Sequence, residues 1–106
     1  MPRLALALLA VCLAAGTASA QGNWPTKPIR IIVPFPPGQS TDILARVMAD
    51  QLTKALGQQV IAENRPGAGG SIGADAAAKA APDGYTLFVG PETTFVVNPS
   101  IYPKLN

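Results

Sequence analysis

Residues 29–44, IRIIVPFPPGQSTDIL, contain the transition that decides the fold. Ile29–Val33 is a short β-branched run, typical of a buried strand. The prolines of Pro34–Gly38 remove backbone donors and block a helix, so this segment is predicted to be a loop. Ser40 or Thr41 then offers an N-cap for a helix over Asp42–Leu56. The stretch therefore predicts a strand, a loop and a helix in direct succession.

The helix is predicted from its apolar period and from its polar pairs. Asp42 and Arg46, like Asp50 and Lys54, are acid-first pairs four residues apart, expected on the outer face. Gly57 suits the position just after the helix. The apolar face is expected to comprise Ile43, Leu44, Val47, Met48, Leu52, Ala55 and Leu56.

The remainder of the chain repeats the alternation of strand and helix. A second strand is predicted over 60–63, a glycine-rich loop over 64–70, a helix over 72–81 capped by Ser71, and a third strand over 85–89. Such alternation implies parallel strands with right-handed crossovers. The predicted fold class is α/β, the start of a doubly wound parallel sheet with strand order 2-1-3. Folds of this class bind ligands beyond the carboxyl ends of the strands.

The first 20 residues have the pattern of a secretory signal peptide. Arg3 supplies the positive charge, an apolar run of 12 residues spans Leu4–Ala15, and Ala18-Ser19-Ala20 is a cleavage site. A membrane anchor would need about 20 apolar residues, so it is the less favoured alternative. Cys12 lies inside this segment and follows Val11, which is unlike a lipidation site. The domain prediction is a signal peptide over 1–20, cut after Ala20, and an exported mature part over 21–106.

Composition excludes several kinds of chemistry. The chain has no histidine, and its single cysteine lies in the predicted leader. The mature part therefore offers no disulfide, no imidazole or thiolate metal site and no His-assisted nucleophile. Its net charge is low and no basic cluster occurs, so nucleic acid is not expected as a partner. No metal, cofactor or catalytic residue is predicted.

The glycine-rich loop fails both nucleotide-binding fingerprints. Each would require glycine at position 72, where Ile72 stands. Backbone N–H groups in this loop, at Gly69–Ile72, and at the helix start Ser40–Asp42 remain able to bind an anion such as a carboxylate. The residues alone leave open whether the glycines serve an anion or only a tight turn. Asp42 is likewise either a polar ligand anchor or a first-turn acid favoured by the helix dipole, and the pattern favours the latter.

Five ordered stretches resemble one known family. They are 24–38 (WPTKPIRIIVPFPPG), Asp42–Arg46, 63–70 (ENRPGAGG), 82–87 (PDGYTL) and 98–102 (NPSIY). Together they are similar to the mature start of the Bug, or TctC-like, receptors, which are the periplasmic substrate-binding proteins of tripartite tricarboxylate transporters. The resemblance covers essentially all of residues 24–105.

The resemblance implies a two-lobed receptor that holds a small carboxylate in its cleft and works with membrane transporter subunits. It implies that 21–106 is the N-terminal part of the first lobe. The ligand-binding residues it points to, together with the topology, are Pro37, Gly38, Gln39, Ser40, Thr41, Asp42, Gly69, Gly70, Ser71, Thr93 and Thr94.

Two departures from the family pattern bear on function. Gln39 replaces the second glycine that the family usually has after Gly38, which would narrow the site or add an amide contact. The family is also several times longer, so we expect the chain to be a fragment that folds poorly or aggregates alone. Two alternatives to the receptor stay open. One is a fragment with no binding activity of its own, and the other is a small α/β enzyme using an anion-bearing cofactor.

Overall fold

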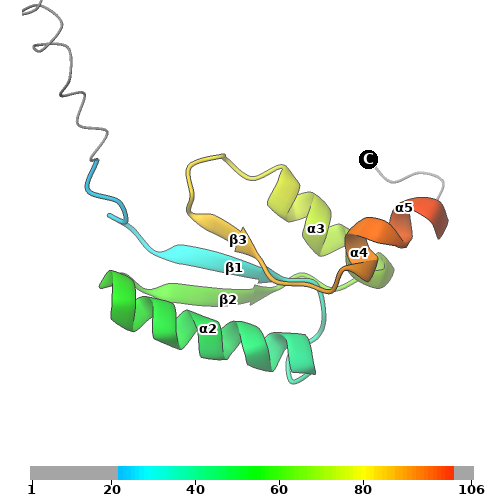
Figure 1. The fold of residues 1–106 in the computed structure, drawn as a ribbon, viewed down its shortest axis with the longest axis horizontal. Helices are drawn as coiled ribbons and strands as arrows, with labels where there is room; N and C mark the ends of the chain where they lie inside the picture. Colours follow the sequence, from blue (N-terminus) through cyan, green and yellow to red (C-terminus); the bar gives the residue numbers. More distant parts are fainter. Residues whose placement is uncertain (1–21, 102–106) are drawn as a thin grey trace, which may run out of the picture.

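The computed structural model describes residues 22–101, which form a three-stranded parallel sheet with β1 in the centre (Figure 1). The strands are β1 (Ile29–Val33), β2 (Val60–Asn64) and β3 (Thr86–Phe88). Their order is β2-β1-β3, and β1 runs parallel to both neighbours. The predicted fold class and the 2-1-3 order are thereby confirmed. The predicted leader over 1–20 lies outside the described residues.

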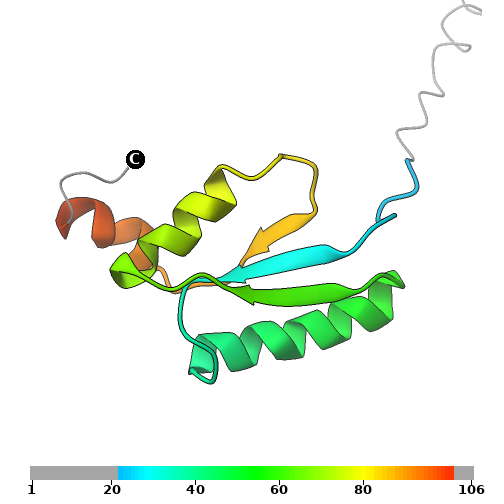
Figure 2. The same ribbon diagram turned by 180° about the vertical axis from the view of Figure 1, so that it is seen from behind.

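Two helices cover the two faces of the sheet. Helix α2 (Ser40–Leu56) packs on β1 and β2, and helix α3 (Ser71–Ala78) packs on β1 and β3 from the other side (Figures 1 and 2). A short 3₁₀ turn, η1 (Ala68–Gly70), leads into α3. Two further single-turn helices, α4 (Thr93–Val96) and α5 (Asn98–Ile101), follow β3.

The core lies between β1 and α2. Because side chains alternate along a strand, Ile29, Ile31 and Val33 face α2, whereas Ile32 faces the side of α3. All four are at most 1% exposed. Ala45 and Ala49 complete the packing from α2, and their small side chains let the helix lie close to the sheet. This core places the carboxyl ends of the strands at one edge.

The predicted apolar face of α2 is wrong in part. Its large side chains Ile43, Leu44 and Val47 are 55–56% exposed and Met48 is 39% exposed. The buried face instead carries Asp42, Ala45 and Ala49, continued by the half-buried Leu52 and Leu56. Both sets have helical spacing. The set with small side chains is the one that fits against the sheet, so Asp42 is buried there and only its partner Arg46 is exposed as expected.

Both predicted serine and threonine caps are also wrong. Ser40 is the first helical residue of α2, and Gln39 occupies the N-cap position in an extended conformation. Ser71 is likewise the first residue of α3, after Gly70 at φ 92°. Helix α3 ends at Ala78 and not at Ala81, because the N–H of Ala80 bonds the carbonyl oxygen of Ala77, three residues back, at 3.3 Å and does not continue the α-helical pattern.

At Gly73, helix α3 lies so close to the segments that follow β1 and β2 that a side chain would not fit. A Cβ there would lie 2.9 Å from the carbonyl oxygen of Arg65 and 2.9 Å from Cα of Pro34. Gly73→Ala should lower the free energy of unfolding by about 1–3 kcal/mol through overpacking, despite alanine's higher helix propensity. Urea denaturation measures the effect. Gly22→Ala, where a Cβ meets open space, is the matched control. Equal or greater stability of Gly73→Ala would contradict the close approach.

Candidate functional site

The loops that follow the three strands meet at the carboxyl edge of the sheet. A Cβ at Gly70 would lie 2.8 Å from Oγ1 of Thr94, 3.3 Å from Cβ of Pro34 and 3.6 Å from the ring of Phe35. Gly70 follows β2, Thr94 follows β3, and Pro34 and Phe35 follow β1. Only a residue without a side chain lets these three segments approach so closely. The predicted site residues Gly70 and Thr94 are thus brought together.

Asn98 holds the glycine-rich loop and the start of α3 through two hydrogen bonds. Its Nδ2 donates to the carbonyl oxygen of Gly69 at 2.8 Å and to Oγ of Ser71 at 3.0 Å. The hydroxyl of Ser71 therefore accepts a bond from α5 and does not cap α3. Asn98 was not predicted as a site residue. The Asn98-Pro99 dipeptide was visible as a motif, but nothing in the sequence identified its partners 27 and 29 residues earlier.

Thr94 carries a buried hydroxyl that the fold leaves free. The residue is 4% exposed, and within residues 22–101 its Oγ1 has no hydrogen-bond partner. Its neighbour Thr93 is exposed at the start of α4. A buried hydroxyl without a partner is costly, so Thr94 is an unusual residue of this edge.

The loop after β1 contributes the second group of predicted residues. Pro37, Gly38, Gln39 and Ser40 are exposed, and Thr41 is half-buried. Gly38 has φ 91°, which favours glycine, whereas Gln39 has φ −79°, which any residue adopts. The substitution of glycine by Gln39 therefore costs no backbone strain. In the described part of the chain no side-chain hydrogen bond caps α2.

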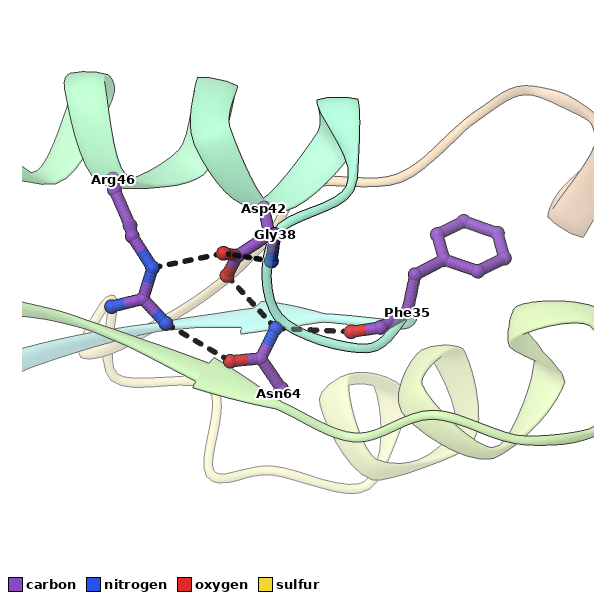
Figure 3. Close-up of polar contacts among 5 residues, drawn as sticks. All are labelled: Phe35, Gly38, Asp42, Arg46 and Asn64. Carbon is purple, nitrogen blue, oxygen red and sulfur yellow. Dashed lines mark hydrogen bonds and ion pairs between the residues drawn. The ribbon is translucent and has the colours of Figure 1, made fainter.

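Asp42 lies at the centre of a buried polar network (Figure 3). Its side chain is 3% exposed. Its Oδ2 accepts bonds from the backbone N–H of Gly38 and from Nε of Arg46, both at 2.9 Å, and its Oδ1 accepts from Nδ2 of Asn64 at 2.9 Å. Asn64 also donates to the carbonyl oxygen of Phe35 at 3.0 Å. Three protein donors thus hold the carboxylate.

These donors shift the ionisation of Asp42. The hydrogen bond from Arg46, followed by those from the Gly38 N–H and Asn64, lowers its pKa from 3.8 to about 2, against the opposing effect of burial. The network is therefore charged at neutral pH. Neither Asn64 nor Arg46 was predicted as a site residue. The Asp42–Arg46 spacing was noted, but the contact with Asn64, 22 residues away from Asp42, had no sequence signal.

Residues 22–101 contain neither a metal cluster nor a membrane-spanning helix. No group of three or more His, Cys, Asp or Glu side chains there could hold a metal ion. In the same range no helix is both long and apolar enough to cross a bilayer.

Comparison with known proteins identifies the family. The family model described as "Tripartite tricarboxylate transporter family receptor" matches residues 44–106. The chain belongs to this receptor family. The family comprises receptors and not enzymes, so the small α/β enzyme considered from the sequence is not the class to which the chain belongs.

Individual relatives agree with this assignment. The chain is 48% identical to Protein BugT of Bordetella pertussis over 109 residues, which covers 99% of this chain and 33% of that protein. MatC from Rhodopseudomonas palustris, solved with bound malate, is 41% identical, with a TM-score of 0.72. The match covers 77% of this chain and 28% of the MatC chain. Rpa4515 from R. palustris, solved with adipate, is 41% identical with a TM-score of 0.64 and covers 66% and 23%. The chain thus spans about a third of BugT and less of the two solved structures.

The lowered pKa of Asp42 predicts an acid-sensitive contribution to stability. Because the folded-state pKa, about 2, lies below the usual value of 3.8, the stabilisation is present above pH 4 and is lost as the pH falls toward 2. Asp42→Asn should therefore be less stable than the wild type at pH 6, and the difference should shrink between pH 4 and pH 2. Chemical denaturation across this range measures it. Asp50→Asn, which breaks the exposed pair with Lys54 in the same helix, should cost only about 0–1 kcal/mol at pH 6. A constant difference for Asp42→Asn across the range would contradict the assignment.

Proposed function

We propose that the chain contributes to the ligand cleft of a periplasmic receptor for a small carboxylate. Membership of the tripartite tricarboxylate transporter receptor family is the observation that carries the proposal. Two relatives with solved structures hold the dicarboxylates malate and adipate. The convergence of the three loops at the carboxyl edge of the sheet supports the same conclusion, because this is where open α/β sheets bind ligands.

The loops supply the groups that a carboxylate requires. The uncapped first turn of α2 presents backbone N–H groups at the positive end of a 17-residue helix. Gly69 is exposed and carries no side chain, and Thr94 adds a hydroxyl donor. We propose that the ligand contacts come from Pro37, Gly38, Gln39, Ser40, Thr41, Gly69, Gly70, Ser71, Thr93 and Thr94. Asp42 was predicted with them, and we assign it a different role below.

The wider organisation follows the same proposal. Residues 1–20 act as a signal peptide that is cut after Ala20, and residues 21–106 form the N-terminal part of the first lobe of the receptor. The receptor delivers its carboxylate to the membrane subunits of a tripartite tricarboxylate-type transporter.

A second candidate is that this chain alone binds no ligand. The observation that favours it is the exposed apolar stripe of α2, formed by Ile43, Leu44, Val47 and Met48. An apolar stripe of this kind is normally covered by other parts of a protein.

Isothermal titration calorimetry distinguishes the two candidates. The purified protein is titrated with malate and adipate, and with malamide as the uncharged control. The proposal expects saturable binding of at least one dicarboxylate and none of malamide, because the helix N-terminus and hydroxyl donors recognise negative charge. Absence of heat with every acid, in a sample that unfolds cooperatively, would favour the second candidate.

Two threonine variants test the place of the ligand. Thr94→Val removes the unpartnered hydroxyl, so the melting temperature should hold or rise while carboxylate affinity falls about tenfold. Thr53→Val is the matched control with the opposite pattern. Its hydroxyl donates to the carbonyl oxygen of Ala49 at 2.7 Å and accepts from the N–H of Val60 at 2.9 Å, near the other end of α2. It should lower the melting temperature and leave affinity unchanged. A Thr94→Val protein that binds like the wild type would remove Thr94 from the site.

A further inference from the structure

We propose that Asp42 and Asn64 are positioning residues that clamp the loop after β1 in its ligand-binding shape without touching the ligand. The proposal rests on the proposed carboxylate function and adds a role for two residues beneath the ligand-binding loop. The loop in question is residues 35–39, between β1 and α2.

The first contact of the clamp is made by Asp42. It is the third residue of α2, and its carboxylate reaches back to the backbone N–H of Gly38 at 2.9 Å. A carboxylate at this helix position commonly bonds the N-cap N–H. Here it bonds the residue before the N-cap, so it holds the end of the loop as well as the start of the helix.

The second contact is made by Asn64 at the end of β2. Its Nδ2 donates to the carbonyl oxygen of Phe35 at 3.0 Å and to Oδ1 of Asp42 at 2.9 Å. Its Oδ1 accepts from Nη2 of Arg46 at 3.2 Å. Only an amide can donate to a carbonyl and a carboxylate while accepting from a guanidinium. The clamp thus needs a side-chain amide at position 64 and joins the loop after β1 to the end of β2.

The two contacts lie at the two ends of a stiff segment. Phe35 is held through its carbonyl oxygen and Gly38 through its N–H, and between them stand Pro36 and Pro37, whose rings fix their φ angles. Fixing both ends therefore sets the conformation of the whole loop. The loop is held in one shape before ligand arrives, which reduces the entropy lost on binding.

Existing hydrogen bonds and negative charge argue against a direct ligand contact for Asp42. Its side chain is 3% exposed, and both carboxylate oxygens already accept protein hydrogen bonds. Arg46, which is 54% exposed, pairs with the carboxylate and offsets its repulsion of an anionic ligand. Asp42 can therefore lie below an anion-binding loop without opposing binding.

Two variants and two controls test the clamp by affinity. Asp42→Asn and Asn64→Ala should each weaken binding of malate or adipate about tenfold. Asp50→Asn, which breaks the exposed pair with Lys54 at 2.6 Å in the same helix, should leave affinity unchanged. Thr53→Val controls for stability, because it should lower the melting temperature without weakening binding. Wild-type affinity in both clamp variants, or an equal loss in Thr53→Val, would overturn the proposal.

A ligand-free measurement keeps the clamp separable from the carboxylate function. Hydrogen exchange of the Gly38 amide, followed by ¹H–¹⁵N NMR, should accelerate at least about tenfold in Asp42→Asn and Asn64→Ala, since this N–H loses its ordered acceptor. The exchange rate of the Gly38 amide should stay at its wild-type value in Asp50→Asn. If the wild type binds no acid, the proposed carboxylate function is wrong. The hydrogen exchange of the Gly38 amide then still tests whether Asp42 and Asn64 hold the loop. If either clamp variant does not fold, Arg46→Gln replaces it, and unchanged exchange of Gly38 there would overturn the proposal.

Discussion

The buried carboxylate of Asp42 is the interaction on which the carboxyl edge of the sheet depends. A buried negative charge is costly unless donors surround it, and three donors from three segments do so here. Those donors are the loop after β1, the second turn of α2 and the end of β2. Satisfying the charge therefore draws the three segments together. The same requirement turns the helix so that Asp42 faces the sheet and Ile43 and Leu44 face outward.

This constraint explains which parts of the fold the sequence could predict. The β-branched run Ile29–Val33, the prolines after it and the glycine-rich loop are local signals, and they correctly predicted the parallel 2-1-3 sheet. The rotation of α2 had no such signal, because two faces of the helix have apolar spacing. Burial of the face with Ala45 and Ala49 depends on how closely a helix packs on the sheet, which is a property of the assembled layers.

The candidate site also has a part that local sequence signals predict and a part that only the assembled fold shows. The convergence of loops was predictable, since parallel strands end at one edge, and Gly70 and Thr94 do meet there. The residues that hold those loops were not predictable. Asn64 bonds Phe35 and Asp42 across 29 and 22 residues, and Asn98 bonds Gly69 and Ser71 across 29 and 27. An asparagine carries no periodic pattern, so only the assembled fold identifies its partners.

Residues 38 and 39 have different roles in the loop: Gly38 fixes its backbone conformation, and Gln39 contributes an exposed side chain. Gly38 has φ 91° and donates its N–H to Asp42, so its backbone is bound to the clamp. Gln39 has an ordinary φ of −79°, no cap bond and an exposed side chain at the N-terminus of α2. A side chain at 39 can therefore change without disturbing the loop, whereas one at 38 would strain it. If the loop binds a carboxylate as proposed above, a side chain at residue 39 can change the ligand contacts while the Asp42 and Asn64 hydrogen bonds keep the backbone donors in place.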